Sequence, residues 1–296
     1  MYKNYSFGAK RSKTDIRDHK LKIAGNPIAQ RISKNLPDAL SLTMPKVKDQ
    51  GSVNSCVAHS AALIEEYFNS TQENDDSKLS VGYIYGTRYN YRGEGMYLRD
   101  ALKTLQTKGC ATNKEFPYNK EVPKQIELVE SHGEFKTAEQ NKISSYFRID
   151  TSNIEDIKYA LFQYGPVMAS IKWHSVYEVY SDGCLKPMID FNPNDDCGYH
   201  CITLIGYNEV GFIFQNSWGK DWGNKGKAIL PYTTKIDEAW GIVDEIYRRD
   251  LEDRTLTTDD DIKITIDTTN CPVLRFIVKS INYIINLFKG LYRSSI

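Results

Sequence analysis

The sequence predicts an α+β protein of two lobes with a cleft between them, and two patterns along the chain lead to this fold class. Helical patterns dominate the first half, where an apolar segment begins near residue 56 and a second one near residue 98. Short runs of strand-forming residues, separated by Gly and Asn turns, dominate the second half. Helices followed by strands favour segregated layers, and a groove between unlike lobes is a common place for a binding site.

The composition is that of a soluble globular protein. The chain has 296 residues, of which 41% are hydrophobic and 26% are charged, and its formal net charge is zero. A neutral chain has no global attraction to nucleic acid, so no nucleic-acid partner is expected. Six cysteines are too few for a disulfide scaffold, and the first residues have no apolar signal-peptide core. We therefore expect an intracellular protein, cytoplasmic or, if viral, within the virion, that is not secreted by a signal peptide.

The chain divides into four predicted regions. Residues 1–35 are polar and basic, and form either a strap on the surface or a segment that masks the cleft. Residues 36–250 carry the periodic patterns of a folded domain. Residues 251–270 read as an acidic linker, and residues 271–296 as a separate amphipathic, basic helix.

The C-terminal helix has one narrow polar stripe. Within residues 273–293 the polar side chains fall at spacings of 4, 3, 4, 3 and 4, and apolar residues fill the rest. Each charge at the middle of a bilayer costs about 2.5–3.5 kcal/mol, which disfavours a simple membrane span. Two readings remain: a helix lying on a membrane surface with its basic stripe towards headgroups, and a helix packed on protein.

The segment that begins at Gln50 runs from a loop into an apolar helix whose first turn holds Cys56. Ser55 or Asn54 is expected to cap this helix, because short polar side chains can accept from its free N–H groups. The helix dipole would then favour the thiolate form of Cys56, which is the nucleophilic form. The alternative is a buried helix that happens to begin with a small apolar cysteine.

The other elements follow from periodicity and from Gly and Pro positions. Pro37 and Pro45 favour extended chain before the first helix. A second helix is predicted over residues 98–105, after the flexible Gly93-Glu94-Gly95, which forms either a turn or a close approach to a ligand. A third helix begins in the capping box 152–155. Strands are predicted at 167–171, 201–207, 211–215 and 226–231.

The chain has only five histidines that could serve a cysteine nucleophile as base. His19 and His132 lie in polar stretches and are expected to be solvated. His59 shares the helix of Cys56 and is expected to be a packed side chain, whereas His174 follows a strand and stays a candidate. His200 stands at the entry of an apolar strand and is the preferred base.

The strand that begins near His200 is followed, one hairpin later, by a strand that ends at Asn216. If the two strands pair, His200 and Asn216 come close together, and the amide oxygen of Asn216 can accept a hydrogen bond from the imidazole. Trp218 could then shield this bond from water. A cysteine, an oriented imidazole and oxyanion donors are the parts that nucleophilic acyl transfer requires.

Three motifs in one order resemble the papain (cathepsin-type) family of cysteine proteases. They are Gln50-Gly51-Ser52-x-x-Ser55-Cys56, Gly198-Tyr199-His200, and Asn216-Ser217-Trp218-Gly219 followed by Trp222-Gly223-x-x-Gly226. The similarity covers residues 36–250, and Asp15-Ile16-Arg17-Asp18 resembles the microbial or large-DNA-virus branch with a short leader. Residue usage rich in Lys, Asn, Ile and Tyr would suit such an AT-rich source.

The resemblance implies a papain-like fold with a helical lobe around a central helix, a β-barrel-like lobe and an active-site cleft between them. It implies that Cys56 is the nucleophile, His200 the base, Asn216 the residue that orients the base, and Gln50 an oxyanion donor. The substrate-binding residues would be Gly95, Met96, Trp218 and Gly198. The implied function is a cysteine endopeptidase that acts on protein or peptide substrates without a metal or other cofactor.

The sequence departs from the family pattern at three positions near these motifs. Val53 replaces a cysteine, so a common disulfide is missing; Val57 replaces an aromatic residue; and Met96 replaces the second glycine of a substrate-binding pair, which affects the P2 preference. Only some 50 residues precede the first motif, and no long helical propeptide is expected. Residues 1–35 could therefore mask the site themselves.

Three alternatives remain open. Cys197-x-x-His200-Cys201, with Cys184, has the spacing of a zinc site, and a metal-bound His200 could not act as a base. The chain could also be a catalytically silent binding module of the same fold. Finally, the same thiol could support acyl transfer or isopeptide cleavage, because nucleophiles other than water can resolve an acyl-enzyme.

Overall fold

The computed structural model of the chain describes residues 6–73, 75, 77–90, 93–119, 135–174, 177–180, 182–187 and 197–244. All of them belong to the first of two compact units, Met1–Asp250. The second unit, Leu251–Ile296, lies outside the described residues, and so do the predicted linker and the predicted C-terminal helix.

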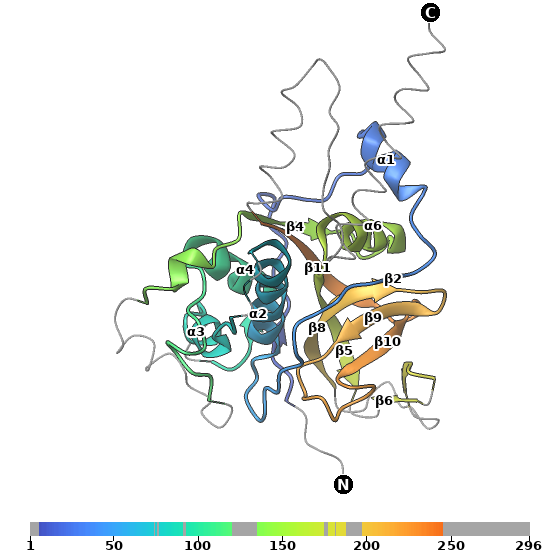
Figure 1. Cartoon of the computed structure of the whole chain (residues 1–296). Helices are drawn as coiled ribbons and strands as arrows, with labels where there is room; N and C mark the ends of the chain where they lie inside the picture. The colour runs from blue at the N-terminus through green and yellow to red at the C-terminus, as the bar shows by residue number, and fades with distance from the viewer. Residues whose placement is uncertain are drawn as a thin grey trace, which may run out of the picture. The chain divides into compact units, whose positions relative to one another are not determined.

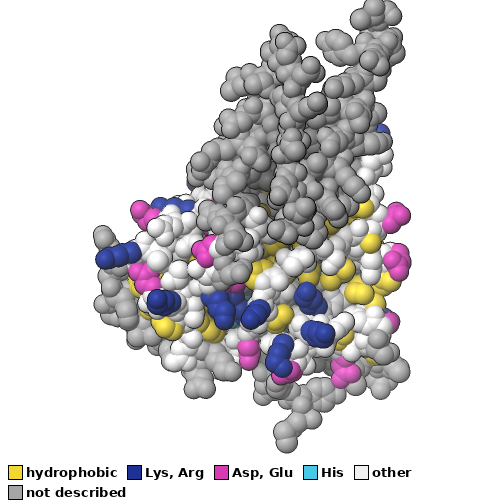
Figure 2. Space-filling model, in the orientation of Figure 1, with side chains coloured by type: hydrophobic (Ala, Val, Ile, Leu, Met, Phe, Trp, Pro, Cys, Tyr) yellow, Lys and Arg dark blue, Asp and Glu magenta, His cyan; other side chains and the backbone are white. Residues whose placement is uncertain are grey.

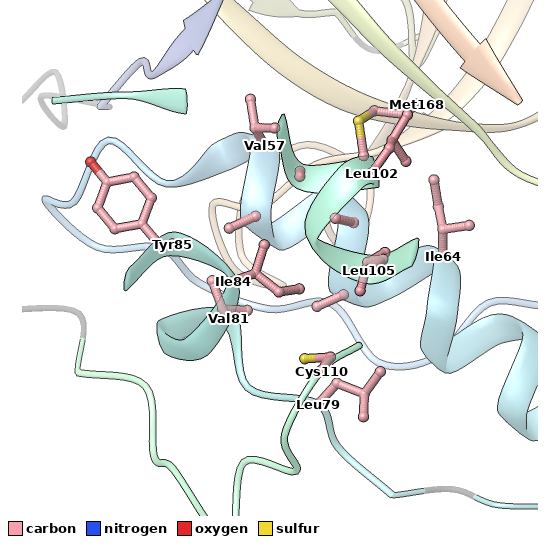
Figure 3. Close-up of a cluster of buried hydrophobic side chains, with 14 of the residues drawn as sticks. Val57, Ile64, Leu79, Val81, Ile84, Tyr85, Leu102, Leu105, Cys110 and Met168 are labelled. Carbon is pink, nitrogen blue, oxygen red and sulfur yellow. The ribbon is translucent and has the colours of Figure 1, made fainter. Parts of the chain in front are cut away.

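The helical lobe is built around α2 (Cys56–Phe68), every residue of which is buried. A helix that is apolar on all sides is stable only when other elements surround it. Two shorter helices, α3 (Val81–Gly86) and α4 (Leu98–Thr107), pack against it, as Figure 3 shows for their apolar side chains. The predicted central helix and the predicted helix over 98–105 are both confirmed. A π-helical turn, η1 (Asn69–Glu73), continues α2.

The second lobe is an antiparallel sheet with the strand order β10-β9-β8-β5-β11-β4, and β2 also pairs with β8. In the described residues β10 and β4 remain edge strands, so the sheet of the predicted barrel-like lobe is open and does not close into a barrel. A smaller pair, β6–β7, stands apart from this sheet. The strands are β2 (Leu40–Ser41), β4 (Ser145–Ile149), β5 (Val167–His174), β6 (Tyr177–Val179), β7 (Leu185–Pro187), β8 (Cys197–Tyr207), β9 (Gly211–Gln215), β10 (Lys227–Pro231) and β11 (Ile236–Val243).

Helix α6 (Ile154–Tyr164) packs on the sheet through its apolar side chains and forms the second core with β5, β8 and β11. Its N-cap is Asn153, whose side-chain oxygen accepts from the backbone N–H of Glu155. The predicted helix start is therefore confirmed, but Asn153 and not Ser152 supplies the cap. A 3-10 turn, η2 (Ala138–Gln140), belongs to the helical lobe, where Ala138 is part of the core.

The predicted strands are present, but β4 and β11 were not expected. In β11 the carboxylate of Glu238 is buried, and it accepts hydrogen bonds from Trp240 Nε1 at 2.7 Å and from the backbone N–H of Ser12 at 2.8 Å. Burying a charged side chain is costly unless hydrogen-bond partners compensate, so a glutamate in the sequence argues against a buried strand. One of those partners here lies 226 positions away in sequence, so no local pattern could reveal it.

The N-terminal strap, defined here as residues 6–21, runs between the two lobes and contacts both (Figure 1). Its strand β1 (Ala9–Lys10) pairs in parallel with β3 (Met96–Tyr97) at the start of α4. Asp18 forms an ion pair with Arg99 of α4 at 2.5 Å. The backbone N–H of Leu21 donates to Arg148 O of β4 at 2.9 Å. After the strap, α1 (Pro27–Ser33) packs against α6.

The described surface carries charges of both signs. On the face shown in Figure 2, Lys and Arg side chains are interspersed with Asp and Glu, as expected for a chain of zero net charge. None of the described helices is both long and apolar enough to cross a membrane.

The buried position of α2 predicts a large loss of stability when its core side chains are shortened. Ile64 is fully buried, so Ile64→Ala should lower the free energy of unfolding by about 2–5 kcal/mol through lost contacts and an unfilled cavity. Urea unfolding followed by circular dichroism measures this difference. Ile28→Ala, at a side chain that is 65% exposed, is the matched control, and equal stability of the two variants would contradict the described core.

Candidate functional site

Cys56 is the first residue of α2 and lies where this helix meets strand β8. Its side chain is fully buried, and its sulfur accepts a hydrogen bond from the backbone N–H of Cys201 at 3.4 Å. Ser55 occupies the N-cap position, but its hydroxyl makes no capping bond and instead contacts Tyr118 Oη at 2.8 Å. Asn54 donates to Glu94, so the predicted side-chain cap of this helix is wrong.

His200 and Asn216 are brought together by the pairing of β8 with β9. Strand β9 ends at Gln215, which lies opposite Thr203, and this register carries Asn216 towards the start of β8. His200 Nε2 lies 2.7 Å from Asn216 Oδ1, and that oxygen also accepts from the backbone N–H of Ser217 at 2.8 Å. The contact predicted from strand pairing is therefore confirmed. This hydrogen bond uses Nε2 of His200, so Nδ1 is the ring nitrogen that can exchange a proton with another group.

Aromatic rings enclose the imidazole of His200. Trp218 stacks on it with ring centroids 4.4 Å apart and an interplanar angle of 28°, so the predicted shielding residue is in place. Trp173, on the neighbouring strand β5, approaches the same imidazole edge-on at 5.3 Å. Trp173 could not be selected from sequence, because its proximity to His200 depends on the register between β5 and β8.

Gln50 is fully buried in the loop that leads into α2, and both the oxygen and the nitrogen of its side-chain amide form hydrogen bonds. Its Oε1 accepts from the hydroxyl of Ser217 at 2.6 Å, and its Nε2 donates to Val53 O at 2.9 Å and to Ser6 O at 3.0 Å. Ser217 thus determines which end of the amide faces the site. Its place in the Asn-Ser-Trp-Gly motif was the only available signal for this role.

The four predicted substrate-binding residues all lie along the strap or next to the site. The backbone N–H of Met96 donates to Gly8 O at 2.8 Å, while the Met96 side chain is fully buried in the helical core. Gly95 has φ +74°, and a Cβ there would lie 2.6 Å from Gly8 O. A Cβ on Gly198 would lie 2.8 Å from the ring of Phe7. Glycine at position 95 therefore allows the backbone of the strap to approach closely, and glycine at position 198 leaves room for the Phe7 side chain.

Burial sets the protonation of the two central groups in this covered state. Desolvation raises the pKa of the Cys56 thiol to about 12, against the lowering effect of backbone N–H groups that include those of Cys201, Val57 and Ala9. Desolvation likewise lowers the pKa of the His200 imidazole to about 4, although the hydrogen bond with Asn216 favours its protonation. Burial therefore opposes the thiolate form that the potential at the helix start was expected to favour.

The other histidines do not compete for the role of base. His59 is packed in α2, where its Nδ1 lies 3.1 Å from Ser55 O, as expected. Its pKa is lowered by burial to about 3. His174 lies at the far end of the β5–β8 ladder, opposite Cys197, and His19 is exposed. His132 lies outside the described residues.

The zinc alternative finds no geometric support in the described part of the chain, where no group of three or more His, Cys, Asp or Glu side chains could hold a metal ion. His200 and Cys201 are neighbours in β8, and neighbouring strand side chains point to opposite faces of the sheet. The described cysteines, Cys184 and Cys197 included, are free thiols, and Cys271 lies outside the described residues.

Solved structures show which fold this geometry belongs to. The chain superposes on the cysteine protease xylellain from Xylella fastidiosa with a TM-score of 0.69 and 24% identity, over 83% of this chain and 98% of xylellain. The described residues therefore have a papain-like fold.

Sequence comparisons give the family. The model of the papain family cysteine proteases matches residues 38–245, so the chain belongs to this family. It is 29% identical to an uncharacterized peptidase C1-like protein of Acanthamoeba polyphaga mimivirus, over 69% of this chain and 68% of that protein. It is 27% identical to a cysteine protease of Blomia tropicalis, over 62% of this chain and 56% of the relative.

The matched region spans little more than half the length of several curated relatives, among them the protease of Blomia tropicalis and two cathepsins K. Matches to animal, plant and viral proteins occur side by side. The microbial or viral short-leader branch therefore stays a prediction.

The burial of Cys56 predicts that its reactivity depends strongly on pH. Because thiolate is the reactive form and burial raises the Cys56 pKa, alkylation of Cys56 by iodoacetamide in the full chain should stay slow at neutral pH and rise into the alkaline range. Mass spectrometry of the modified cysteine over a pH series measures this profile, with the exposed Cys197 as a reference for solvent access. A Cys56 rate that levels off at or below neutral pH would contradict the prediction.

Proposed function

We propose that this protein is a cysteine peptidase that hydrolyses peptide bonds of protein or peptide substrates through an acyl-enzyme on Cys56. The observation that carries the proposal is the 2.7 Å contact between His200 Nε2 and Asn216 Oδ1. This contact orients the imidazole and leaves Nδ1 to exchange a proton with Cys56. The sulfur of Cys56 is held nearby, by the backbone N–H of the residue that follows His200.

The reaction divides into two steps. First, the Cys56 sulfur attacks the peptide carbonyl carbon, its proton passes to His200 Nδ1, and His200 then protonates the leaving amine as the C–N bond breaks. Second, His200 removes a proton from water, which attacks the thioester and releases the acid and the thiol. Asn216 keeps the imidazole in one orientation through both steps, and Trp218 keeps water from their bond.

Gln50 and the backbone N–H of Cys56 are the proposed donors to the oxyanion. Gln50 Nε2 already donates to a carbonyl oxygen, that of Ser6, at 3.0 Å. This contact supports the proposed role, because its acceptor is a peptide carbonyl. Donors that are oriented before the reaction stabilise the developing charge without reorganising, and one such donor can be worth about 2.7–4 kcal/mol.

The nucleophile and the orienting residue should differ in the size of their effects. Cys56→Ala should abolish both cleavage of a fluorogenic peptide and labelling by an epoxide probe, because it removes the attacking atom. Asn216→Ala should lower turnover by a smaller factor, roughly 10- to 150-fold, if the lost hydrogen bond to a charged imidazole is worth about 1.5–3 kcal/mol.

Cys197→Ala is the matched control, because Cys197 is an exposed cysteine at the start of the same strand as His200. This variant should cleave and label as the natural sequence does. Full activity of Cys56→Ala would overturn the proposed mechanism.

We also infer that the strap masks the site, as the sequence suggested for residues 1–35. Four consecutive residues of the strap contribute. Ser6 O occupies Gln50 Nε2, Phe7 lies 6.1 Å edge-on from the His200 ring, Gly8 O accepts from Met96 N–H, and the Ala9 N–H lowers the pKa of the Cys56 thiol. Strap and substrate would therefore compete for the same donors.

Masking should be relieved by a change that pushes the strap out of the site. A Cβ on Gly8 would lie 2.0 Å from Asn54 O, a backbone atom, so Gly8→Ala cannot keep the described path. We expect peptidase turnover and Cys56 alkylation at neutral pH to rise together, on the order of tenfold for each 1.4 kcal/mol by which the closed form is destabilised.

Ile16→Ala is the control for this experiment, because Ile16 belongs to the same strap but its side chain is 99% exposed. It should leave both rates unchanged. If Gly8→Ala left turnover and alkylation at their original values, the strap would be a surface feature without a masking role.

A further inference from the structure

The loop Gly93–Met96 carries the backbone N–H that pairs with a peptide strand in the site. Met96 N–H donates outward, to Gly8 O of the strap at 2.8 Å. The N–H and the carbonyl of the preceding residue, Gly95, bond to side chains of the helical lobe and not to the strap. Its N–H donates to the hydroxyl of Tyr85 at 3.1 Å, and its carbonyl accepts from Asn90 Nδ2 at 2.9 Å. The inward bonds of Gly95 thus determine that Met96 faces the site.

Tyr85 reaches this loop from the core of the helical lobe. Its side chain belongs to α3 and is 1% exposed. Figure 3 shows it at the edge of the hydrophobic cluster, with the hydroxyl pointing away from the other labelled side chains. Its ring is therefore held by packing, and the hydroxyl is a rigid acceptor for Gly95.

Arg88 holds the tyrosine and the loop together. Its guanidinium lies 3.8 Å from the centroid of the Tyr85 ring, and its Nη1 donates to Tyr85 O at 2.5 Å. Its Nη2 donates to Gly93 O at 2.8 Å, and the side chain is only 2% exposed. A planar guanidinium can stack and donate in two directions at once, which lysine cannot do.

A further contact ties the loop to the segment before the nucleophile. Asn54, two residues before Cys56 in the chain, donates a hydrogen bond from its Nδ2 to Glu94 Oε2 at 2.5 Å. The described cysteines form no disulfide, and this hydrogen bond adds to the packing of Met96 in the core around α2.

We propose that Tyr85 and Arg88 are positioning residues for peptide binding, which set the direction of the Met96 N–H through Gly93 and Gly95. This inference rests on the proposed peptidase function for its meaning in catalysis. Without the hydroxyl of Tyr85, the buried N–H of Gly95 loses its acceptor, and the loop must turn to find another. The Met96 N–H then no longer points at a bound strand.

Tyr85→Phe in the full chain separates this role from a change in the strap alone. The variant weakens the pairing of Met96 with any strand, whether the strap or a substrate. We therefore expect alkylation of Cys56 to become faster, because the strap opens more often. In the Gly8→Ala background, where the strap is displaced and no longer competes, Tyr85→Phe should raise KM for a peptide substrate by ~5- to 10-fold, the loss expected for one hydrogen bond, with kcat little changed.

Tyr83→Phe is the matched control, since Tyr83 lies on the same helix and its ring packs against Phe135 instead of reaching the loop. It should change neither KM nor the alkylation rate. Arg88→Lys should reproduce the pattern of Tyr85→Phe, because it keeps the charge but loses the two-way contact of the guanidinium. It also serves as the second variant if Tyr85→Phe folds poorly.

Two results would overturn the proposal. One is a KM and an alkylation rate that both stay at the original values. The other is faster alkylation with a KM that does not rise in the Gly8→Ala background, which would mean that only the strap had been loosened. If the natural sequence cleaves no peptide, the proposed function fails, and hydrogen exchange at the Met96 amide decides the positioning role on its own. Faster exchange in Tyr85→Phe supports it, and unchanged exchange overturns it.

Discussion

The packing of the first turn of α2 against strand β8 is the contact on which the rest of the site depends. It buries Cys56 beside the backbone of Cys201, with 3.4 Å between the sulfur and the donating nitrogen. Because His200 precedes Cys201 in the same strand, that one contact also sets where the imidazole stands. The pairing of β8 with β9 then supplies Asn216, and Ser217 turns the Gln50 amide towards the same point. Two lobes that differ in structure thus supply one site.

Burial gives this site its electrostatic character. A thiol and an imidazole that are both fully buried favour their neutral forms, so the pKa values of Cys56 and His200 shift in the directions opposite to those that an ion pair requires. Residues of the strap also occupy the Gln50 amide and the Met96 N–H. Opening the strap would therefore free the donors and restore solvent to the two groups in a single movement, and this couples access to reactivity.

The sequence predicted those parts of the structure that depend on local periodicity and on residues close in the chain. The apolar α2, the helix over 98–105 and the approach of His200 to Asn216 all follow from such patterns. The contacts made by Ser6 and Phe7, the ring of Trp173 and the hydroxyl of Tyr85 depend on partners that are distant in sequence or on strand register. The helix potential at Cys56 is visible in sequence, whereas the burial that raises the pKa of its thiol depends on packing between distant elements. The predicted membrane or protein contact of residues 273–293 lies outside the described residues.

The proposed mechanism requires that the acyl group is transferred to the sulfur atom of Cys56. Rapid mixing of the protein with an ester or peptide substrate, followed by acid quench and mass spectrometry of the digested chain, tests it most directly, because the thioester survives in acid and can be located. We expect an adduct with the mass of the acyl fragment on Cys56 alone. An acyl group on Cys184, Cys197 or another residue, or cleavage that passes through no covalent adduct, would contradict it.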